Sequence, residues 1–200
     1  MYSTVFFDVY GTVARINHPA TPYRVFKEKL PERWRDFKSV LMTGDYGLPE
    51  MQDKFSLALT EAELHASEAD IALQQQSITL FDDAIPTFRL LRGKGIKVGL
   101  ISNLAQPYGG PIRDLIADEV DDYIFSFEVG FIKPDKAIFD QACKRFSCAH
   151  NDALMVGDSF RSDYQGAKLA GLDALLLKRD ALSDEMHVIA SLNELTLKCE

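Results

Sequence analysis

Side chains that could take part in chemistry stand at or just after the ends of several short apolar runs. They are two carboxylates at Asp8 and Asp158, a hydroxyl and an amide at Ser102 and Asn103, and an ammonium group at Lys133. In open α/β sheets, ligands bind in the crevice beyond the carboxyl ends of the strands. If the apolar runs are parallel strands of one sheet, these five side chains share a crevice that can bind a small molecule and react with it.

The apolar runs have the length and composition of buried strands. Each is short, apolar on both faces and bounded by polar residues or glycine, and helix-like segments lie between them. Strands that alternate with helices pair in parallel through right-handed crossovers. We therefore predict an α/β fold, a doubly wound three-layer sandwich with a mainly parallel sheet of five or six strands. The predicted strands are residues 4–7, 98–101, 123–125, 153–156 and 175–177, and the predicted helices are residues 84–92, 110–117, 136–146 and 164–170.

The segment from residue 15 to residue 80 interrupts this alternation. It has no strand-like run and carries apolar residues at helical spacing instead, as at Tyr23, Phe26 and Leu30. We expect residues 15–80 to form a helical cap domain that is inserted after the first strand. The α/β core domain then consists of residues 1–14 and 81–200.

Four short motifs follow one another in the order of a known enzyme superfamily. They are Asp8-Val9-Tyr10-Gly11-Thr12, Ser102-Asn103, Lys133-Pro134 and Gly157-Asp158-Ser159-Phe160-Arg161-Ser162-Asp163. Each motif alone is common, but four in this order, each at or just beyond a predicted strand end, resemble the motifs of the haloacid dehalogenase superfamily. The resemblance covers most of the chain. It implies a hydrolase with a Rossmann-like core and a cap.

The resemblance implies a catalytic role for four residues. Asp8 would be the nucleophile that attacks a phosphorus or carbon centre and forms an ester intermediate. Thr12 and Ser102 would donate hydrogen bonds to the oxygens of the bound group. Lys133 would stabilise the negative charge of the transition state.

The resemblance also implies a metal site and substrate contacts. Mg²⁺ prefers oxygen ligands, and Asp8, Asp158, Asp163 and the backbone carbonyl of Tyr10 would supply them. We expect the substrate itself to contact the residues Tyr10, Gly11, Asn103 and, from the cap, Arg24.

Ordinary structural roles are alternatives for the same residues. Asp8 could simply end a strand in a turn, and Ser102 with Asn103 could cap a helix, because both residue types are favoured there. Lys133, considered alone, could be a solvated loop lysine. Asp163 could be only the N-cap of the helix that follows it.

Tyr10 departs from the pattern of the superfamily's phosphatases, which generally carry a second aspartate two residues after the nucleophile. That aspartate protonates the leaving group, and such acid-base help is worth about 10²- to 10⁴-fold in rate. The carboxylates of the implied metal site nevertheless favour a Mg²⁺-dependent phosphatase, and the missing acid restricts it to a small phosphorylated metabolite with a good leaving group. A binding protein that kept the fold but lost turnover is one alternative.

A metal-independent 2-haloacid dehalogenase is the other alternative. Tyr10 resembles that branch, in which halide departs without a proton, and Arg15 or Arg24 could help to capture the halide or the carboxylate. Asp158 and Phe139 argue against it, because the branch usually has an uncharged residue and an aromatic hydroxyl there. Without a cation, Asp158 would also repel a carboxylate substrate.

Composition excludes several classes of protein. The chain has 200 residues and a net charge of −8 that is spread along its length, which disfavours nucleic acid as a partner. No apolar run is long enough to span a bilayer, and no signal peptide is evident. The three cysteines suggest neither a disulfide framework nor a thiolate metal site. We expect a cytoplasmic enzyme, monomeric or homodimeric, whose substrate the sequence does not identify.

Overall fold

A six-stranded parallel sheet forms the centre of the protein. The computed structural model describes residues 2–179 and 185–195, and within them the strand order is β5-β4-β1-β6-β7-β8. The predicted parallel sheet is confirmed, and the two-residue strand β8 is the addition that the sequence pattern did not indicate. The strands are β1 (Thr4–Phe7), β4 (Lys97–Ser102), β5 (Asp122–Phe125), β6 (Ala153–Gly157), β7 (Asp173–Leu177) and β8 (Val188–Ile189).

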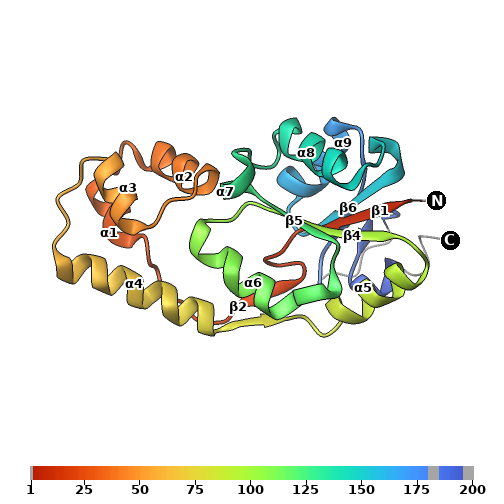
Figure 1. Ribbon diagram of the computed structural model, residues 1–200, viewed down its shortest axis with the longest axis horizontal. Helices are drawn as coiled ribbons and strands as arrows, with labels where there is room; N and C mark the ends of the chain where they lie inside the picture. Colours follow the sequence, from red (N-terminus) through yellow and green to blue (C-terminus); the bar gives the residue numbers. More distant parts are fainter. Residues whose placement is uncertain (1, 180–184, 196–200) are drawn as a thin grey trace.

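Helices cover both faces of this sheet, as a doubly wound fold requires. Helices α5 (Ala84–Gly93) and α6 (Gly109–Ile116) lie on one face, and α8 (Lys136–Phe146) and α9 (Gly166–Ala170) lie on the other (Figure 1). Because successive side chains of a strand point to opposite faces, β1 contributes to both layers. The Phe7 ring lies 5.0 Å from the Phe88 ring of α5, and the Phe6 ring lies 5.0 Å from the Phe146 ring of α8.

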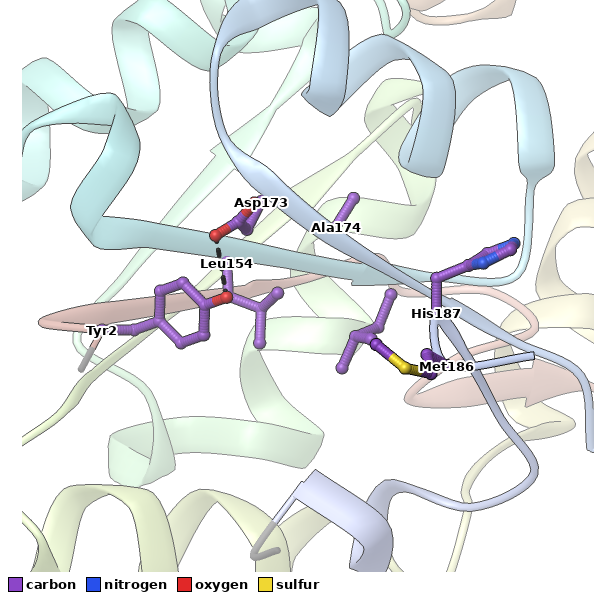
Figure 2. Close-up of a pocket in the computed structure, with 7 residues that line it drawn as sticks. Tyr2, Leu154, Asp173, Ala174, Met186 and His187 are labelled. Carbon is purple, nitrogen blue, oxygen red and sulfur yellow. Dashed lines mark hydrogen bonds between the residues drawn. The ribbon is translucent and has the colours of Figure 1, made fainter. Parts of the chain in front are cut away.

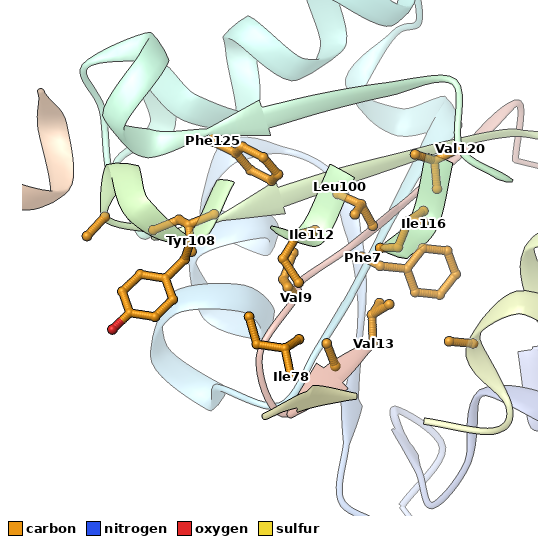
Figure 3. Close-up of a cluster of buried hydrophobic side chains, with 14 of the residues drawn as sticks. Phe7, Val9, Val13, Ile78, Leu100, Tyr108, Ile112, Ile116, Val120 and Phe125 are labelled. Atoms are coloured by element: carbon orange, nitrogen blue, oxygen red, sulfur yellow. The ribbon is translucent and has the colours of Figure 1, made fainter. Parts of the chain in front are cut away.

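The larger apolar layer lies between the sheet and helices α5 and α6. Figure 3 shows Phe7 and Leu100 of neighbouring strands next to Ile112 and Ile116 of α6. Val9, directly after Asp8, is fully buried in the same cluster. The backbone on each side of Asp8 is therefore fixed by packed apolar side chains, which gives the carboxylate a rigid support.

The loop after β6 begins with a π-helical turn. Residues Phe160–Gln165 form this turn, and α9 continues from it. The sequence predicted one helix over residues 164–170, so the helical segment starts earlier than expected. Ser159 caps the turn, because its hydroxyl accepts a hydrogen bond from the Ser162 N–H at 3.1 Å. The turn places residues 158–163 at the carboxyl edge of the sheet.

Four helices between β1 and α5 pack around aromatic side chains at the end of the molecule away from the described termini (Figure 1). Phe37 of α2 lies at their centre, with its ring 5.0 Å from that of Phe26 and 5.3 Å from that of Phe55. The helices are α1 (Arg24–Lys29), α2 (Trp34–Thr43), α3 (Leu48–Lys54) and α4 (Glu61–Gln76). Helix α4 begins with a capping box between Thr60 and Glu63.

A two-stranded antiparallel ribbon joins these helices to the sheet. It consists of β2 (Ala14–Ile16) and β3 (Ile78–Leu80), whereas the sequence suggested no strand within residues 15–80. Three residues are too few to display an alternating pattern, which explains why the ribbon was missed. The cap boundaries at residues 15 and 80 stay a prediction.

None of the helices in the described part of the chain is both long and apolar enough to cross a membrane. Cys143 and Cys148 carry free thiols. Cys199 lies outside the described residues.

Candidate active site

Three neighbouring strands bring the first residues of the site together. β1 lies between β4 and β6, and Asp8 follows β1, Ser102 ends β4 and Asp158 follows β6. The Ser102 hydroxyl donates to Asp8 Oδ1 at 3.3 Å. Because the helical segments after Ser102 start only at Gln106, this contact replaces the helix-capping role that was the alternative for Ser102.

Lys133 enters the same crevice from the loop before α8. Its side chain is buried, and Nζ donates to Asp8 Oδ1 at 2.6 Å, to Asp163 Oδ1 at 2.6 Å and to the carbonyl of Ile101 at 2.7 Å. Burial by itself would lower the pKa of Lys133, but the two carboxylates raise it above its ordinary value. Lys133 is therefore a charged residue of the site and not a solvated loop lysine.

Asn103 holds the backbone of this lysine loop. Its side-chain oxygen accepts from the Lys133 N–H at 2.7 Å, and its side-chain nitrogen donates to the Lys133 carbonyl at 2.8 Å. The sequence suggested that Asn103 contacts substrate, and that contact stays a prediction. In the structure both polar atoms of Asn103 are used to position Lys133.

Three carboxylates converge beside the ammonium group. Oxygen atoms of Asp8, Asp158 and Asp163 all lie within 4.8 Å of one another. Burial raises the pKa of Asp8 to about 6, with a further contribution from Asp163 and Asp158 that Lys133 partly offsets. Burial and the charge of Asp163 also raise the pKa of Asp158. One ammonium group does not balance three carboxylates, so the cluster is suited to bind a cation.

Two glycines make this approach of the carboxylates possible. A Cβ atom on Gly11 would lie 2.1 Å from Asp158 Oδ2, and Gly11 also has a φ of +91°. A Cβ atom on Gly157 would lie 2.3 Å from Asp163 Cγ. Both distances are far below van der Waals contact, so the motif glycines are required for space around the acidic cluster. Gly11 does not line the 180 Å³ cavity above the carboxylates, so its predicted contact with substrate stays a prediction.

A cavity of about 180 Å³ opens above the carboxylates. It is smaller than the roughly 300 to 1,000 Å³ of typical small-molecule sites, so it can accept a compact group such as a phosphoryl group and not a whole metabolite. Every residue of its lining carries a polar or charged side chain. The lining residues are Asp8, Tyr10, Ser102, Asn103, Lys133, Asp158, Ser159, Ser162 and Asp163.

Ser159 and Ser162 are members of this lining that the sequence analysis did not assign. Ser159 uses its N–H to donate to Asp163 Oδ2 at 2.9 Å, so it helps to orient that carboxylate. Asp163 is thereby held by Ser159 and Lys133 and is not a helix N-cap. The position of both serines within the fourth motif was a signal that could have identified them.

Thr12 and Arg24 do not line the cavity. Thr12 is fully buried, its carbonyl accepts from Arg179 at 2.6 Å, and its hydroxyl has no hydrogen-bond partner within the described residues. Arg24 lies on α1, 3.7 Å from Glu28, in a hollow between α1 and α4. The roles assigned to Thr12 and Arg24 stay predictions that no contact in the structure supports.

Tyr10 is one of the residues that line the cavity, and its ring packs edge-to-face with that of Tyr108, at 6.2 Å between ring centroids. Its hydroxyl is buried and has no hydrogen-bond partner among residues 2–179 and 185–195. Burial, together with Tyr108, raises the pKa of Tyr10 above its ordinary value. The phenol is therefore protonated at neutral pH and cannot act as a base.

A second cavity, of about 450 Å³, lies away from these groups. It includes Leu154 and Asp173, at the amino ends of β6 and β7, and Figure 2 shows Tyr2 donating to Asp173 there, at 2.9 Å. The acidic cluster lies at the carboxyl ends of the strands, which is the opposite edge of the sheet. This cavity therefore does not belong to the candidate active site.

Comparison with known proteins agrees with this geometry. The sequence profile of a family described as haloacid dehalogenase-like hydrolase matches residues 2–171. A glyceraldehyde 3-phosphate phosphatase of Methanothermobacter thermautotrophicus is 35% identical over 107 residues, which are 52% of this chain and 47% of that protein. The chain thus spans about half the length of the curated relatives that it matches.

Solved structures resemble the chain over nearly its whole length. The crystal structure of a HAD phosphatase from Thermococcus onnurineus covers 100% of this chain and 98% of its own, with a TM-score of 0.69 and 25% identity. A 2-haloacid dehalogenase from Pseudomonas syringae covers 98% of this chain and 97% of its own, with a TM-score of 0.65 and 19% identity. The second likeness shows the fold alone.

Proposed function

This chain belongs to the haloacid dehalogenase-like hydrolases, and from its site we propose that it is a Mg²⁺-dependent phosphatase of small phosphorylated metabolites, with Asp8 as nucleophile. The observation that carries the proposal is the convergence of Asp8, Asp158 and Asp163 on one cavity beside Lys133. A dehalogenase substrate is itself a carboxylate, which three acids repel. A phosphate monoester is also an anion, but it is bound together with the cation that such a cluster attracts.

The chemical steps need only the groups around Asp8. A carboxylate oxygen of Asp8 attacks phosphorus and forms an acyl phosphate, while the bond between phosphorus and the leaving oxygen breaks. Water then attacks the same phosphorus, the bond between phosphorus and the Asp8 oxygen breaks, and phosphate and a proton are released as the carboxylate is restored. Lys133 and Ser102, which both donate to Asp8 Oδ1, orient the nucleophile and lie close enough to stabilise the charge of the transferred group.

The acidic cluster fits a hard cation. Asp8 and Asp158 are the favoured ligands, because both oxygens of Asp163 already accept hydrogen bonds from Lys133 and Ser159. The carbonyl of Tyr10 is the remaining predicted ligand. When bound, Mg²⁺ would neutralise the excess negative charge and polarise the phosphoryl oxygens.

Tyr10 limits the range of good substrates. Its phenol is a poor acid, so an alkoxide leaving group would depart without effective protonation. The leaving groups of aryl and acyl phosphates are stable as anions, so their rate of hydrolysis falls much less when the acid is absent. The proposed enzyme is therefore weak on alkyl esters and more active on phosphates with good leaving groups.

Tyr10 is also the one observation that favours hydrolytic dehalogenation as a second candidate, because halide needs no proton to depart. The absence of a catalytic acid at position 10 would equally suit a protein that binds phosphorylated ligands without hydrolysing them. A hydrolysis assay distinguishes the dehalogenase and the binding protein from the phosphatase.

The deciding experiment is hydrolysis of p-nitrophenyl phosphate and acetyl phosphate with and without Mg²⁺. We expect turnover that EDTA abolishes, that added Mg²⁺ restores, and that is absent from the isosteric variant Asp8→Asn. Turnover that is indifferent to EDTA would contradict the proposal. Release of chloride from 2-chloropropionate without added metal would establish the dehalogenase instead, and no turnover in either assay would favour a binding protein.

A further inference from the structure

A larger cavity continues from the small one toward helix α2. Its volume is about 610 Å³, and it shares Asn103, Lys133 and Ser162 with the 180 Å³ cavity over the carboxylates. Its lining comes from α2, from the segment 132–134 before α8, from Asn103 and from the turn after β6. Figure 1 shows α2 next to α7 (Ser126–Val129), where the four-helix group meets the core. The residues that line it are Arg35, Lys38, Ser39, Met42, Asn103, Ile132, Lys133, Pro134, Arg161 and Ser162.

The charged residues of this lining are all cationic. Arg35 and Lys38 come from α2, Arg161 comes from the turn between Asp158 and Asp163, and the buried Lys133 stands at the junction with the small cavity. The first three are exposed. Within the described part of the chain, these three make no ion pair with a carboxylate, and no acid lines the cavity. Lys38 Nζ lies over the Trp34 ring, 5.9 Å from its centroid, a contact that leaves its charge uncompensated.

The sizes of the two cavities determine where the parts of a substrate lie. The small cavity holds little more than a phosphoryl group, so the rest of a phosphorylated metabolite must extend into the larger one. That cavity has the volume typical of a small-molecule site. Met42, Ile132 and Pro134 provide an apolar surface for a carbon chain, and the cations face whatever group stands at its far end.

We propose that the natural substrate carries a second anionic group, a carboxylate or a second phosphate, which Arg35, Lys38 and Arg161 bind in the 610 Å³ cavity. This inference rests on the proposed phosphatase function and narrows its substrate class. Guanidinium groups suit such a site because their planar N–H donors match carboxylate and phosphate oxygens. The opposite charges of the two cavities then fix the orientation of the substrate, with the phosphoryl group at the acidic cluster and its cation.

One other basic hollow adjoins the acidic cluster, and it is less suited to an anion. Arg15, Lys178 and Arg179 line it, but Asp158 lines it as well. Arg179 is already paired with Asp83, at 2.9 Å. No carboxylate lines the 610 Å³ cavity beside Arg35, Lys38 and Arg161.

The test compares phosphates that differ only in the second group. Glycerol 3-phosphate against 3-phosphoglycerate isolates a carboxylate, and fructose 6-phosphate against fructose 1,6-bisphosphate isolates a second phosphate. The inhibition constant of each is measured against hydrolysis of p-nitrophenyl phosphate, so slow turnover of alkyl esters does not matter. We expect the doubly anionic member of at least one pair to bind about tenfold more tightly, as several exposed ion pairs together allow. The pair that shows the preference identifies the second group.

Charge-removing variants locate the preference. The triple variant Arg35→Gln, Lys38→Gln, Arg161→Gln should lose most of the preference for the doubly anionic compound, and each single variant should lose part of it. Lys144→Gln, which removes an exposed lysine from the last turn of α8, is the matched control and should keep it. Thermal melting confirms that all variants are folded.

The outcomes separate this inference from the proposed function. No preference in either pair, or a preference that survives in the triple variant, overturns the second-anion site even if p-nitrophenyl phosphate is hydrolysed normally. If no phosphatase activity is found, calorimetric titration of the four compounds into the wild-type protein and into the triple variant decides the same question. In that case a preference that depends on the three cations would support the site, and equal binding would overturn it.

Discussion

Lys133 and Asp8 are 125 positions apart in the chain, yet Lys133 Nζ lies 2.6 Å from Asp8 Oδ1. The same ammonium group lies 2.6 Å from Asp163 Oδ1, so one cation holds two buried carboxylates. Burial and the neighbouring acids raise the pKa of Asp8, while Lys133 opposes that shift. The contact therefore both orients the proposed nucleophile and favours its ionised, reactive form.

Replacing Lys133 with methionine should damage both activity and stability. Loss of a group that stabilises transition-state charge costs on the order of 10²- to 10³-fold in rate. Loss of one partner from a buried ion pair costs about 3 to 5 kcal/mol of unfolding free energy, because the other charge is left uncompensated. The measurements are kcat on p-nitrophenyl phosphate and urea denaturation.

Lys133→Arg is the control for this prediction. It keeps the charge, so it should recover much of the stability but not the activity, since a guanidinium group cannot reproduce the three Nζ contacts. A methionine variant as stable and as active as the wild type would show that the ion pair is incidental.

Replacing Gly11 with alanine should weaken Mg²⁺ activation. The added Cβ would stand 2.1 Å from Asp158 Oδ2, so the carboxylate must move. Displacement of a metal-site group typically costs about 10- to 100-fold in metal affinity. The Mg²⁺ concentration for half-maximal activity should rise by that factor, in assays run well below the melting temperature.

The control for Gly11 is Gly110→Ala on α6. No atom outside the local helix lies within 4 Å of a Cβ built there, so this variant should keep the wild-type response to Mg²⁺. If Gly11→Ala shows an unchanged Mg²⁺ requirement, Asp158 is not a ligand of the activating cation.

Replacing Tyr10 with aspartate should extend activity to alkyl phosphates. A carboxyl group at this position can protonate an alkoxide leaving group, and such help is worth about 10²- to 10⁴-fold. We expect the ratio of kcat/KM on glycerol 3-phosphate to that on p-nitrophenyl phosphate to rise at least tenfold. Tyr10→Phe removes only the hydroxyl and should leave the ratio at its wild-type value. Equal ratios in the aspartate and wild-type proteins would mean that Tyr10 does not occupy the position of the missing acid.

The sheet and the edge that carries the candidate site were predictable because their signals are local. Each strand of four or more residues is a buried apolar run in the sequence, as at 153–156. Parallel strands place their carboxyl ends at one edge of the sheet. Asp8, Ser102 and Asp158 meet there for that reason. The strand β8 has only two residues, too few to produce a pattern of its own.

The side of the candidate site that α2 forms was not predictable in this way. Which face of α2 turns toward the core depends on how the helical group packs, and periodicity does not determine that. The sequence suggested Arg15 or Arg24 as the cation of the predicted cap and did not distinguish them from Arg35, which lines the cavity next to Lys133 together with Lys38. The role of Asn103 was similarly hidden, since its partner is the backbone of a loop 30 positions away.

Asp83, at the start of α5, ties distant parts of the core together. Its carboxylate accepts from both terminal nitrogens of Arg179 at 2.9 Å, from the Ser191 hydroxyl at 2.8 Å and from the Leu192 N–H at 2.9 Å. Asp83→Asn removes the charge and part of these bonds. We expect the free energy of unfolding at neutral pH to fall by about 1 to 3 kcal/mol, the size of the loss when a partly buried charged group loses its hydrogen bonds.

The loss of unfolding free energy caused by Asp83→Asn should become smaller as the pH falls. Burial by itself would raise the pKa of Asp83, but the hydrogen bonds from Arg179, Leu192 and Ser191 hold it below its ordinary value. A carboxylate whose pKa is lower in the folded state stabilises the fold fully above its unfolded pKa of about 4, and this stabilisation disappears as the pH falls through the folded pKa. The difference in unfolding free energy between wild type and variant, measured by urea denaturation, should therefore be constant near neutrality and shrink below about pH 4. A difference that grows on acidification would mean that Asp83 is not ionised in the folded protein, and the assigned hydrogen bonds would then have to be revised.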